Sequence, residues 1–567
     1  MPRNGNLFSL YDKDFTMTGD KVKPDLSRRG RGNSLSERKK TCVRMPMKKE
    51  HNETIYQKNN TALRFAIHTL GCRVNTYESD AIAQSLRAAG FSECDFSEPA
   101  DVYIVNTCTV TNVADKKSRQ MLHRAKKLNP SALIVAAGCY VDAALQNQEM
   151  QQLLKDAAID LLVPNREKPR IAELVAERLL SSGTDQDRSA ADKTEKKGGA
   201  PVAVSCEAAE PGTPRQLFMT ELDGHTRAFV KVQDGCNQFC SYCIIPYVRG
   251  RISSRPIEAC VDEITRLTEN GVREVVLTGI HLSSYGKDWV TADRRTGSAG
   301  AGTLENTAGN ERHTGDHITD TNQVPHPGDD IMNAENAPLL TLLSAVHAIP
   351  GIERIRMGSL EPRLMSEAFV SRLAKLPKVC PHFHLSLQSG CAETLRRMNR
   401  HYTPEEYREV CKRLRRYYDD PAITTDVIVG FPGETEAEFE ESRRFIEEIG
   451  FYELHVFKYS RRAGTRADRM EGQVAETVKE ARSHILLELA DRMSHAYREH
   501  FLGKEVSLLC EEEVRISGKA FASGYSREYV RCLKPCGTEG FIRNAVVRGT
   551  VSEISREKEV YETLILR

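Results

Sequence analysis

Strand-like and helix-like segments alternate along residues 63–141, and this alternation restricts the fold more than any other feature of the chain. The segments "LRFAIHTLG", "ADVYIVNT" and "ALIVAAG" have strand character, and helical spacing follows each of the first two. Strands that alternate with helices form βαβ units around a mainly parallel sheet. We therefore predict an α/β fold that begins with an open parallel-sheet domain over residues 63–180.

A second α/β region is predicted over residues 222–495. Helical segments separate its strand-like segments, as a β/α barrel requires. These segments are 273–280, 354–360, 382–390, 423–433 and 453–460. Short alternating segments then fill residues 500–567, a pattern typical of a small antiparallel β-barrel. With 567 residues, the chain is too long for one hydrophobic core, so several domains are expected.

Three further segments lack a core pattern. Residues 1–60 are polar and basic, and we expect a disordered leader there. Residues 181–215 are small, polar and proline-bearing, which is typical of a linker. Residues 288–336 interrupt the second region and predict an exposed insertion, because long surface insertions cost little closure entropy.

The composition says more about the cellular compartment of the protein than about its binding partner. A net charge of +1 gives no overall sign of a polyanionic partner and excludes none, because basic residues can be gathered in local patches. No apolar run is long enough to span a bilayer, and no signal peptide is evident, so we expect a cytoplasmic protein without membrane contact. Sixteen cysteines in such a compartment argue against a disulfide framework.

Cys236, Cys240 and Cys243 form a C-x3-C-x2-C run directly after a predicted strand. A structural zinc site wants four ligands, and a saturated 4Fe-4S cluster wants four thiolates. Three thiolates leave one iron with an open position for a substrate or cofactor. Zinc with a remote fourth ligand, or a chance cluster of core cysteines, is the alternative.

Cys72, Cys108 and Cys139 each stand at the end of a predicted strand of the first domain. In an open parallel sheet the carboxyl ends of the strands form the crevice where ligands bind. Three cysteines placed alike on successive strands can therefore converge on one point. A single cysteine of this kind is more often a buried core residue, but three favour a second metal cluster.

The C-x3-C-x2-C run resembles the signature of the radical S-adenosylmethionine (SAM) superfamily. This run, the three earlier cysteines and the predicted C-terminal barrel occur together in the methylthiotransferase family, which the chain therefore resembles. In that family the C-terminal barrel is called TRAM. The segments "GCRVNTYESD", "NTCTVTNVADKKSRQ" and "FVKVQDGCNQFCSYCIIPYVRGR" look most similar to the branch that acts on threonylcarbamoyladenosine in tRNA. The resemblance covers nearly all of residues 63–567, apart from the linker and the insertion.

The resemblance implies two 4Fe-4S clusters and SAM as cofactors. Cys236, Cys240 and Cys243 would be the catalytic set that holds the radical-generating cluster, and the other three cysteines would hold a cluster that carries the sulfur. One SAM would supply the methyl group, and another the radical that abstracts hydrogen from carbon 2 of a modified adenosine beside the anticodon. The implied partners are the tRNA anticodon stem-loop and an electron donor such as flavodoxin or ferredoxin.

Residues that line the SAM pocket carry over from four family segments, "LTGIHLSSYG", "LSLQSG", "MNRHY" and "TDVIVGFPGET". The resemblance implies cofactor-binding roles for Gly279, Gln388, Ser389, Arg400 and Asp426. Gly279 would let the backbone approach the cofactor, and the other four offer polar groups near strand ends. For each of them an ordinary loop or capping role is the alternative.

Three other functions remain open at this point. The enzyme could act on isopentenyladenosine in tRNA, or on a ribosomal-protein side chain as another branch of the family does. A metal-binding scaffold attached to an RNA-binding barrel is the non-enzymatic alternative. In that barrel Tyr525 and Tyr529 alternate with Arg527 and Arg531, and such rings can stack on bases. The basic stretches 116–127, 249–255 and 396–418 could bind RNA or be solvated helix faces.

Overall fold

The structure is a computed structural model of the chain. It describes residues 57–58, 61–147, 159–184, 202–203, 216–220, 226–289, 337–538, 540–555 and 562–567. Nearly all of the predicted leader 1–60 therefore lies outside the described residues. Among the helices of these ranges, none is long and apolar enough to cross a membrane.

The first domain is built on a parallel sheet, as predicted. Its strand order is β4-β3-β5-β6-β7-β8, and every neighbouring pair is parallel. The strands of this region are β1 (Gln57–Lys58), β2 (Thr61–Ala62), β3 (Arg64–Thr69), β4 (Ser92–Glu93), β5 (Val102–Thr107), β6 (Leu133–Gly138), β7 (Leu161–Val163) and β8 (Val202–Ala203). β5 and β6 are buried along their whole length, which is why they are almost entirely apolar.

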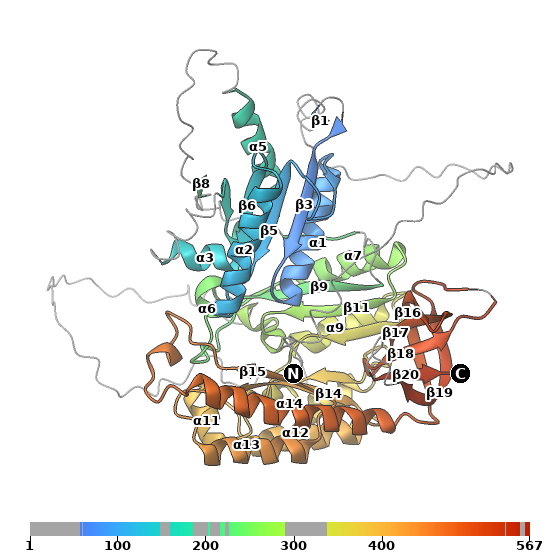
Figure 1. Ribbon diagram of the computed structural model, residues 1–567. Helices are drawn as coiled ribbons and strands as arrows, with labels where there is room; N and C mark the ends of the chain where they lie inside the picture. The colour runs from blue at the N-terminus through green and yellow to red at the C-terminus, as the bar shows by residue number, and fades with distance from the viewer. Residues whose placement is uncertain are drawn as a thin grey trace, which may run out of the picture. The chain divides into compact units, whose positions relative to one another are not determined.

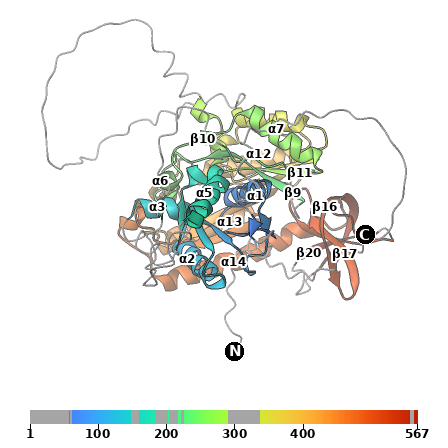
Figure 2. The same cartoon turned by 90° about the horizontal axis from the view of Figure 1, so that it is seen from above.

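Helices connect the strands of this sheet. They are α1 (Arg73–Ala88), α2 (Asn112–Leu128), α3 (Cys139–Leu145), the 3-10 helix η2 (Asn165–Arg170) and α5 (Ile171–Thr184). Figure 2 shows α1 and α5 side by side. The side chain of Thr111 caps α2 by accepting a hydrogen bond from the amide of Ala114 at 3.1 Å. The range predicted as a linker, 181–215, contains the end of α5 and all of β8.

The central region contains two sheets that together form an incomplete barrel. One has the order β10-β9-β11-β12 and the other β13-β14-β15. Isolated bridges from Ile355 to Val379 and from Leu360 to Leu385 link the region of β12 to that of β13. The strands are β9 (Arg227–Asp234), β10 (Ser253–Ser254), β11 (Glu274–Gly279), β12 (Arg354–Met357), β13 (His382–His384), β14 (Ala422–Val429) and β15 (Glu453–Lys458). The five predicted strands are all present but shorter.

Helices flank the two central sheets, and α12, α13 and α14 lie side by side along β14 and β15 (Figure 1). The helices are α6 (Ile245–Val248), α7 (Ile257–Glu269), α9 (Pro338–Ala348), α10 (Glu367–Leu373), α11 (Ala392–Arg397), α12 (Pro404–Tyr417), α13 (Glu436–Ile449) and α14 (Glu476–Glu499). Short 3-10 helices are η3 (Leu282–Ser284), η5 (Pro362–Leu364) and η6 (Ala467–Arg469). Thr403 begins α12 with a capping box, and Thr435 begins α13 in the same way.

The C-terminal strands close into a barrel of order β16-β17-β18-β20-β19. Its strands are β16 (Glu505–Ile516), β17 (Lys519–Tyr525), β18 (Arg531–Pro535), β19 (Val546–Ser555) and β20 (Thr563–Leu566). All pairs are antiparallel, as predicted, except β18 with β20, which is parallel.

The predicted insertion 288–336 begins within described structure, because Asp288 accepts a hydrogen bond from the amide of Ser254 at 3.0 Å. Residues 290–336 lie outside the described residues.

Candidate functional site

Three cysteines meet at the carboxyl edge of the first sheet. Cys108 directly follows β5, Cys139 directly follows β6 and begins α3, and Cys72 precedes α1. Gly71 has a φ of +104°, and a Cβ atom added to it would lie 2.9 Å from the sulfur of Cys108. A side chain is therefore excluded at position 71, and the backbone before Cys72 comes close to Cys108.

The thiols of this set act on one another electrostatically. Burial, together with the charges of Cys139 and Cys72, raises the pKa of Cys108 to about 12. Desolvation and the charge of Cys139 also raise the pKa of Cys72, although Cys72 itself is exposed. Thiolates that repel one another in this way need a positive charge in order to ionise together, and an iron-sulfur cluster supplies such a charge. The donor set therefore fits a metal cluster.

The second set lies in the loop after β9. Gly235 has a φ of +66°, and a Cβ atom there would overlap the backbone carbonyl of Arg251, so only glycine fits before Cys236. The amide of Cys243 donates to the carbonyl of Cys240 at 2.9 Å, which curls the loop. The amide of Ser241 donates to the carbonyl of Met398 at 3.0 Å and fixes the loop to the end of α11.

These three thiols behave like the first three. Burial raises the pKa of Cys243 to about 12, and the charges of Cys240 and Cys236 contribute to the rise. Burial raises the pKa of Cys236 to about 11. The set is therefore also suited to a bound metal cluster rather than to free thiolates.

A buried arginine donates to one sulfur of each set. Nη1 of Arg400 lies 3.3 Å from the sulfur of Cys240, and Nε of Arg249 lies 3.2 Å from the sulfur of Cys139. Hydrogen bonds to cluster sulfurs and nearby charge are what tune the reduction potential of an iron-sulfur site. Each set thus has one cation placed to do this.

Arg249 also joins the two regions that carry the cysteines. Its side chain is fully buried, and Nη1 lies 3.0 Å from Glu78 of α1 and 3.1 Å from Asp234 of β9. Nη2 donates to the side-chain oxygen of Asn75 at 2.6 Å. Lys231 contacts the same two carboxylates at 2.8 and 3.0 Å. This network fixes α1 and α3 against the loop that holds the second set.

The residues predicted for the SAM pocket have different partners in the structure, and their role at SAM stays a prediction. Gly279 packs against Gln233, because a Cβ atom there would lie 2.8 Å from its side-chain oxygen. Gln388 has a φ of +68° and bridges to β14, where its amide donates to the carbonyl of Asp426 at 2.8 Å. Ser389 is buried and accepts a hydrogen bond from the amide of Cys391 at 3.2 Å.

Several polar residues of the site had no sequence signal of their own. Glu361 lies 3.3 Å from His281, 3.2 Å from Gln238 and 3.9 Å from Arg400. Although burial opposes it, His281 and Arg400 hold the pKa of Glu361 at about 2. Gln233 accepts from the amide of His281 at 2.8 Å, so it holds the end of β11 to the cysteine loop.

Two groups of residues predicted to contact RNA have partners within the protein. Tyr525 and Tyr529 stack on each other with ring centroids 4.6 Å apart, and Arg227 covers both rings. The rings therefore have partners within the protein but stay partly exposed, and their stacking on bases stays a prediction. In the basic stretch on α12, Arg408 and Arg413 form ion pairs with glutamates of neighbouring helices at 2.7 and 3.0 Å, which favours a structural role.

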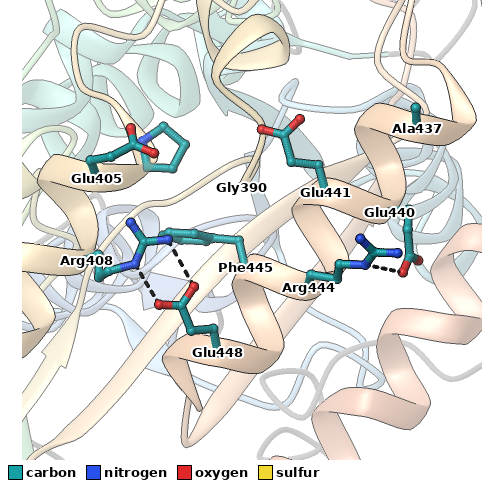
Figure 3. Close-up of a pocket in the computed structure, with 10 residues that line it drawn as sticks. Gly390, Glu405, Arg408, Ala437, Glu440, Glu441, Arg444, Phe445 and Glu448 are labelled. Atoms are coloured by element: carbon teal, nitrogen blue, oxygen red, sulfur yellow. Dashed lines mark hydrogen bonds and ion pairs between the residues drawn. The ribbon is translucent and has the colours of Figure 1, made fainter.

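A surface cavity of about 470 Å³ lies between α12 and α13 (Figure 3). Its charged walls pair with one another, Arg408 with Glu448 at 2.7 Å and Arg444 with Glu440 at 2.9 Å. None of the six cysteines lines it. The cavity is therefore a gap between paired helices that none of the predicted site residues lines.

Comparison with known proteins agrees with this geometry. Residues 230–446 match the Radical SAM superfamily, and residues 64–163 match the Uncharacterized protein family UPF0004. The threonylcarbamoyladenosine tRNA methylthiotransferase MtaB of Bacillus subtilis is 33% identical over 482 residues, which cover 85% of this chain and 92% of that protein. This chain belongs to the radical SAM methylthiotransferase family. It is of the MtaB type and, as a radical SAM enzyme, uses SAM and a 4Fe-4S cluster.

Other relatives of this methylthiotransferase carry a different name. The tRNA-2-methylthio-N(6)-dimethylallyladenosine synthase of Caldicellulosiruptor saccharolyticus is 33% identical, with 81% of this chain and 84% of that protein covered. Among solved structures, the radical SAM methyltransferase TsrM of Kitasatospora setae matches with a TM-score of 0.44 at 16% identity, covering 70% of this chain and 73% of that one. The identities of the relatives alone do not choose between their substrates.

Proposed function

We propose that the enzyme adds a methylthio group to carbon 2 of N6-threonylcarbamoyladenosine beside the tRNA anticodon. The names of the MtaB relatives support the substrate, and the family supports the reaction. The observation that carries the proposal is the convergence of Cys72, Cys108 and Cys139 at one edge of the first sheet. A second three-thiol set offers a place for the cluster that would carry the inserted sulfur.

We assign Cys236, Cys240 and Cys243 to the radical-generating 4Fe-4S cluster, and Cys72, Cys108 and Cys139 to a second cluster. Three cysteines leave one iron of each cluster free of a protein thiolate. When bound, the two clusters and SAM supply the radical, the sulfur and the methyl group that protein side chains cannot provide.

The side chains of the chain bind and orient these groups. We assign Gly279, Gln388, Ser389 and Arg400 to the SAM site, where Arg400 also holds the sulfur of Cys240. Phe239, packed on Tyr247 with ring centroids 5.8 Å apart, covers the cysteine loop and limits the access of water. The Arg249 network fixes the distance between the two thiol sets, so that substrate held between them meets both.

The tRNA is proposed to approach over α2, which begins shortly after Cys108. Exposed lysines and arginines follow this helix, namely Lys116, Lys117, Arg124 and Lys127. Phosphates account for most of the affinity of a protein for nucleic acid, and such a helix face is suited to them. An electron donor such as flavodoxin or ferredoxin would reduce the first cluster.

Nucleoside analysis of tRNA tests the proposed substrate. Deleting the gene is expected to abolish the 2-methylthio derivative of threonylcarbamoyladenosine, and restoring the full chain is expected to bring it back. Restoring a Cys108→Ala chain is the matched control and is expected to fail. If the deletion instead removes the methylthio derivative of isopentenyladenosine, or a modified ribosomal protein, the substrate proposal is wrong.

A further inference from the structure

One face of the β13-β14-β15 sheet is lined with polar side chains. Side chains two positions apart on a strand share a face, and the register sets His384 beside Thr424 and Asp426 beside His455. The polar set is His382, His384, Thr424, Asp426, Glu453 and His455. Parallel strands with both faces covered are ordinarily apolar throughout. A polar row here therefore requires a reason beyond folding.

The polar side chains are held close together. Nδ1 of His384 lies 2.9 Å from the hydroxyl of Thr424, and Nε2 lies 3.3 Å from the carboxylate of Asp426. The rings of His384 and His455 stack with centroids 5.8 Å apart. The side chain of Asp426 is 29% exposed to solvent, so a ligand can reach this face.

Arg73 of α1 brings a positive charge to the same place. It directly follows Cys72, and its guanidinium lies 5.7 Å from the ring of Phe229 and 6.0 Å from the ring of Tyr529. Its charge acts on His382, Asp426, Glu453 and His455, which all lie on the polar face. The polar face thus meets the first domain at the residue next to a cluster cysteine.

His382 provides a second, separate indication that this face binds a ligand. Its side chain is 3% exposed, its ring lies 5.1 Å from that of Tyr529, and neither ring nitrogen has a hydrogen-bond partner among the described residues. A buried imidazole N–H without a partner is costly, because it gives up its bonds to water. A polar ligand on this face would satisfy it.

A metal ion is the competing occupant, because ligand atoms of His384, Asp426 and His455 lie within 4.8 Å of one another. The positive charge of Arg73 opposes a cation at this point, and both ring nitrogens of His384 already face protein oxygens. The combination of a guanidinium, two carboxylates and imidazoles instead complements an organic group that carries an anionic group beside hydrogen-bond donors and acceptors.

We propose that this face binds the N6 substituent of the target adenosine, with Arg73 paired to its carboxylate and with Asp426 and His382 bonded to its hydroxyl and carbamoyl groups. The proposal rests on the proposed function, because the threonylcarbamoyl group carries all three of these. It assigns Asp426 to the substrate in place of the role at SAM predicted from the resemblance. A dimethylallyl group would leave the polar face unpaired, and sites built to bond a polar group reject such analogues strongly.

The test compares two anticodon stem-loop RNAs with the full-length, anaerobically reconstituted enzyme. One RNA carries threonylcarbamoyladenosine and the other carries its methyl ester, which lacks only the negative charge. Dissociation constants from fluorescence anisotropy and values of kcat/KM for methylthio product are measured at one salt concentration, because phosphate contacts depend on salt. We expect the wild type to prefer the acid by about 100-fold.

Arg73→Met is expected to reduce this preference to about 3-fold or less, and Arg73→Lys to keep about 10-fold, because lysine retains the charge without the planar fork. Iron content checks that Arg73→Met folds and holds its clusters. Arg444→Met, on the outer face of α13, is the matched control and should prefer the acid as the wild type does.

The outcomes separate this inference from the function on which it rests. If the wild type converts the acid and Arg73→Met keeps the full preference, the inference is wrong and the proposed function stands. If the wild type converts neither RNA but converts an isopentenyladenosine stem-loop assayed beside them, both are wrong. The inference would also be wrong if the wild type binds one further metal ion per chain, besides the cluster iron, and His455→Ala loses that ion.

Discussion

Replacing Arg249 by methionine removes the side chain that ties the first thiol set to the second. In the native protein the fully buried guanidinium contacts Glu78 at 3.0 Å, Asp234 at 3.1 Å and the sulfur of Cys139 at 3.2 Å. Methionine has a similar length but can donate to none of these groups. The buried Glu78 then keeps Lys168 and Lys231 as partners, and the partly exposed Asp234 keeps Lys231.

The size of the effect follows from this burial. Removing one partner of a buried ion pair costs about 3–5 kcal/mol when the other charge is left without compensation. Because lysines still contact both carboxylates, we expect a smaller loss of about 2 kcal/mol. We expect the free energy of local opening of α1 and α3 to fall by that amount. Amide hydrogen exchange of the reconstituted enzyme measures it directly, since these amides report local opening. The reduction potential of the second cluster should also become more negative, because an N–H bond to its sulfur is lost.

Arg249→Lys is the matched variant. It keeps the charge but not the planar fork, so about half of the stability loss is expected. Unchanged hydrogen exchange in α1 and α3, together with an unchanged potential in Arg249→Met, would refute the conclusion that Arg249 couples the two sets.

Three further predictions follow from single residues. Arg400→Met should weaken SAM binding by about 10-fold or more in equilibrium dialysis without loss of iron, because Arg400 holds Cys240 and faces Glu361; unaltered affinity would contradict this. Gly235→Ala should lower the iron from about eight to about four per chain, because a Cβ atom cannot fit beside Arg251; a full complement of iron would contradict this. Neighbouring arginines hold the pKa of Glu274 at about 2, below its usual 4.5, although burial opposes this shift. The ionised carboxylate therefore stabilises the fold above pH 4.5, and this stabilisation is lost as the pH falls toward 2. Glu274→Gln should therefore cost about 3 kcal/mol at neutral pH, measured by urea unfolding, and the difference from the wild type should shrink with acidification; a difference that is independent of pH would contradict this.

The order of strands and helices was predictable because hydrophobic periodicity is a local property. The apolar runs of β5 and β6 and the cysteines that end them locate the first sheet and its carboxyl edge without tertiary information. The parallel pairing of β18 with β20 was not predictable, because strand order in a barrel depends on contacts between distant segments.

Spacing along the chain predicted the six cysteines as cluster ligands, but it did not predict their surroundings. Arg249 and Glu78 are far apart in sequence and show no motif together, although they form an ion pair at 3.0 Å. The polar face with His382 and Asp426 was also missed, since on one strand at a time it looks like ordinary alternation. The stacking of Tyr525 on Tyr529 was also not predictable, because a sequence does not show which rings contact each other.

The most direct test of the central claim is the iron content and product profile of a Cys72→Ala, Cys108→Ala, Cys139→Ala variant beside the wild type. Two clusters predict about eight irons in the wild type and about four in the variant after anaerobic reconstitution. The variant should still cleave SAM to 5′-deoxyadenosine on reduction and should form no methylthio nucleoside on a threonylcarbamoyladenosine stem-loop. Equal iron in the two proteins, or methylthio product from the variant, would contradict the account.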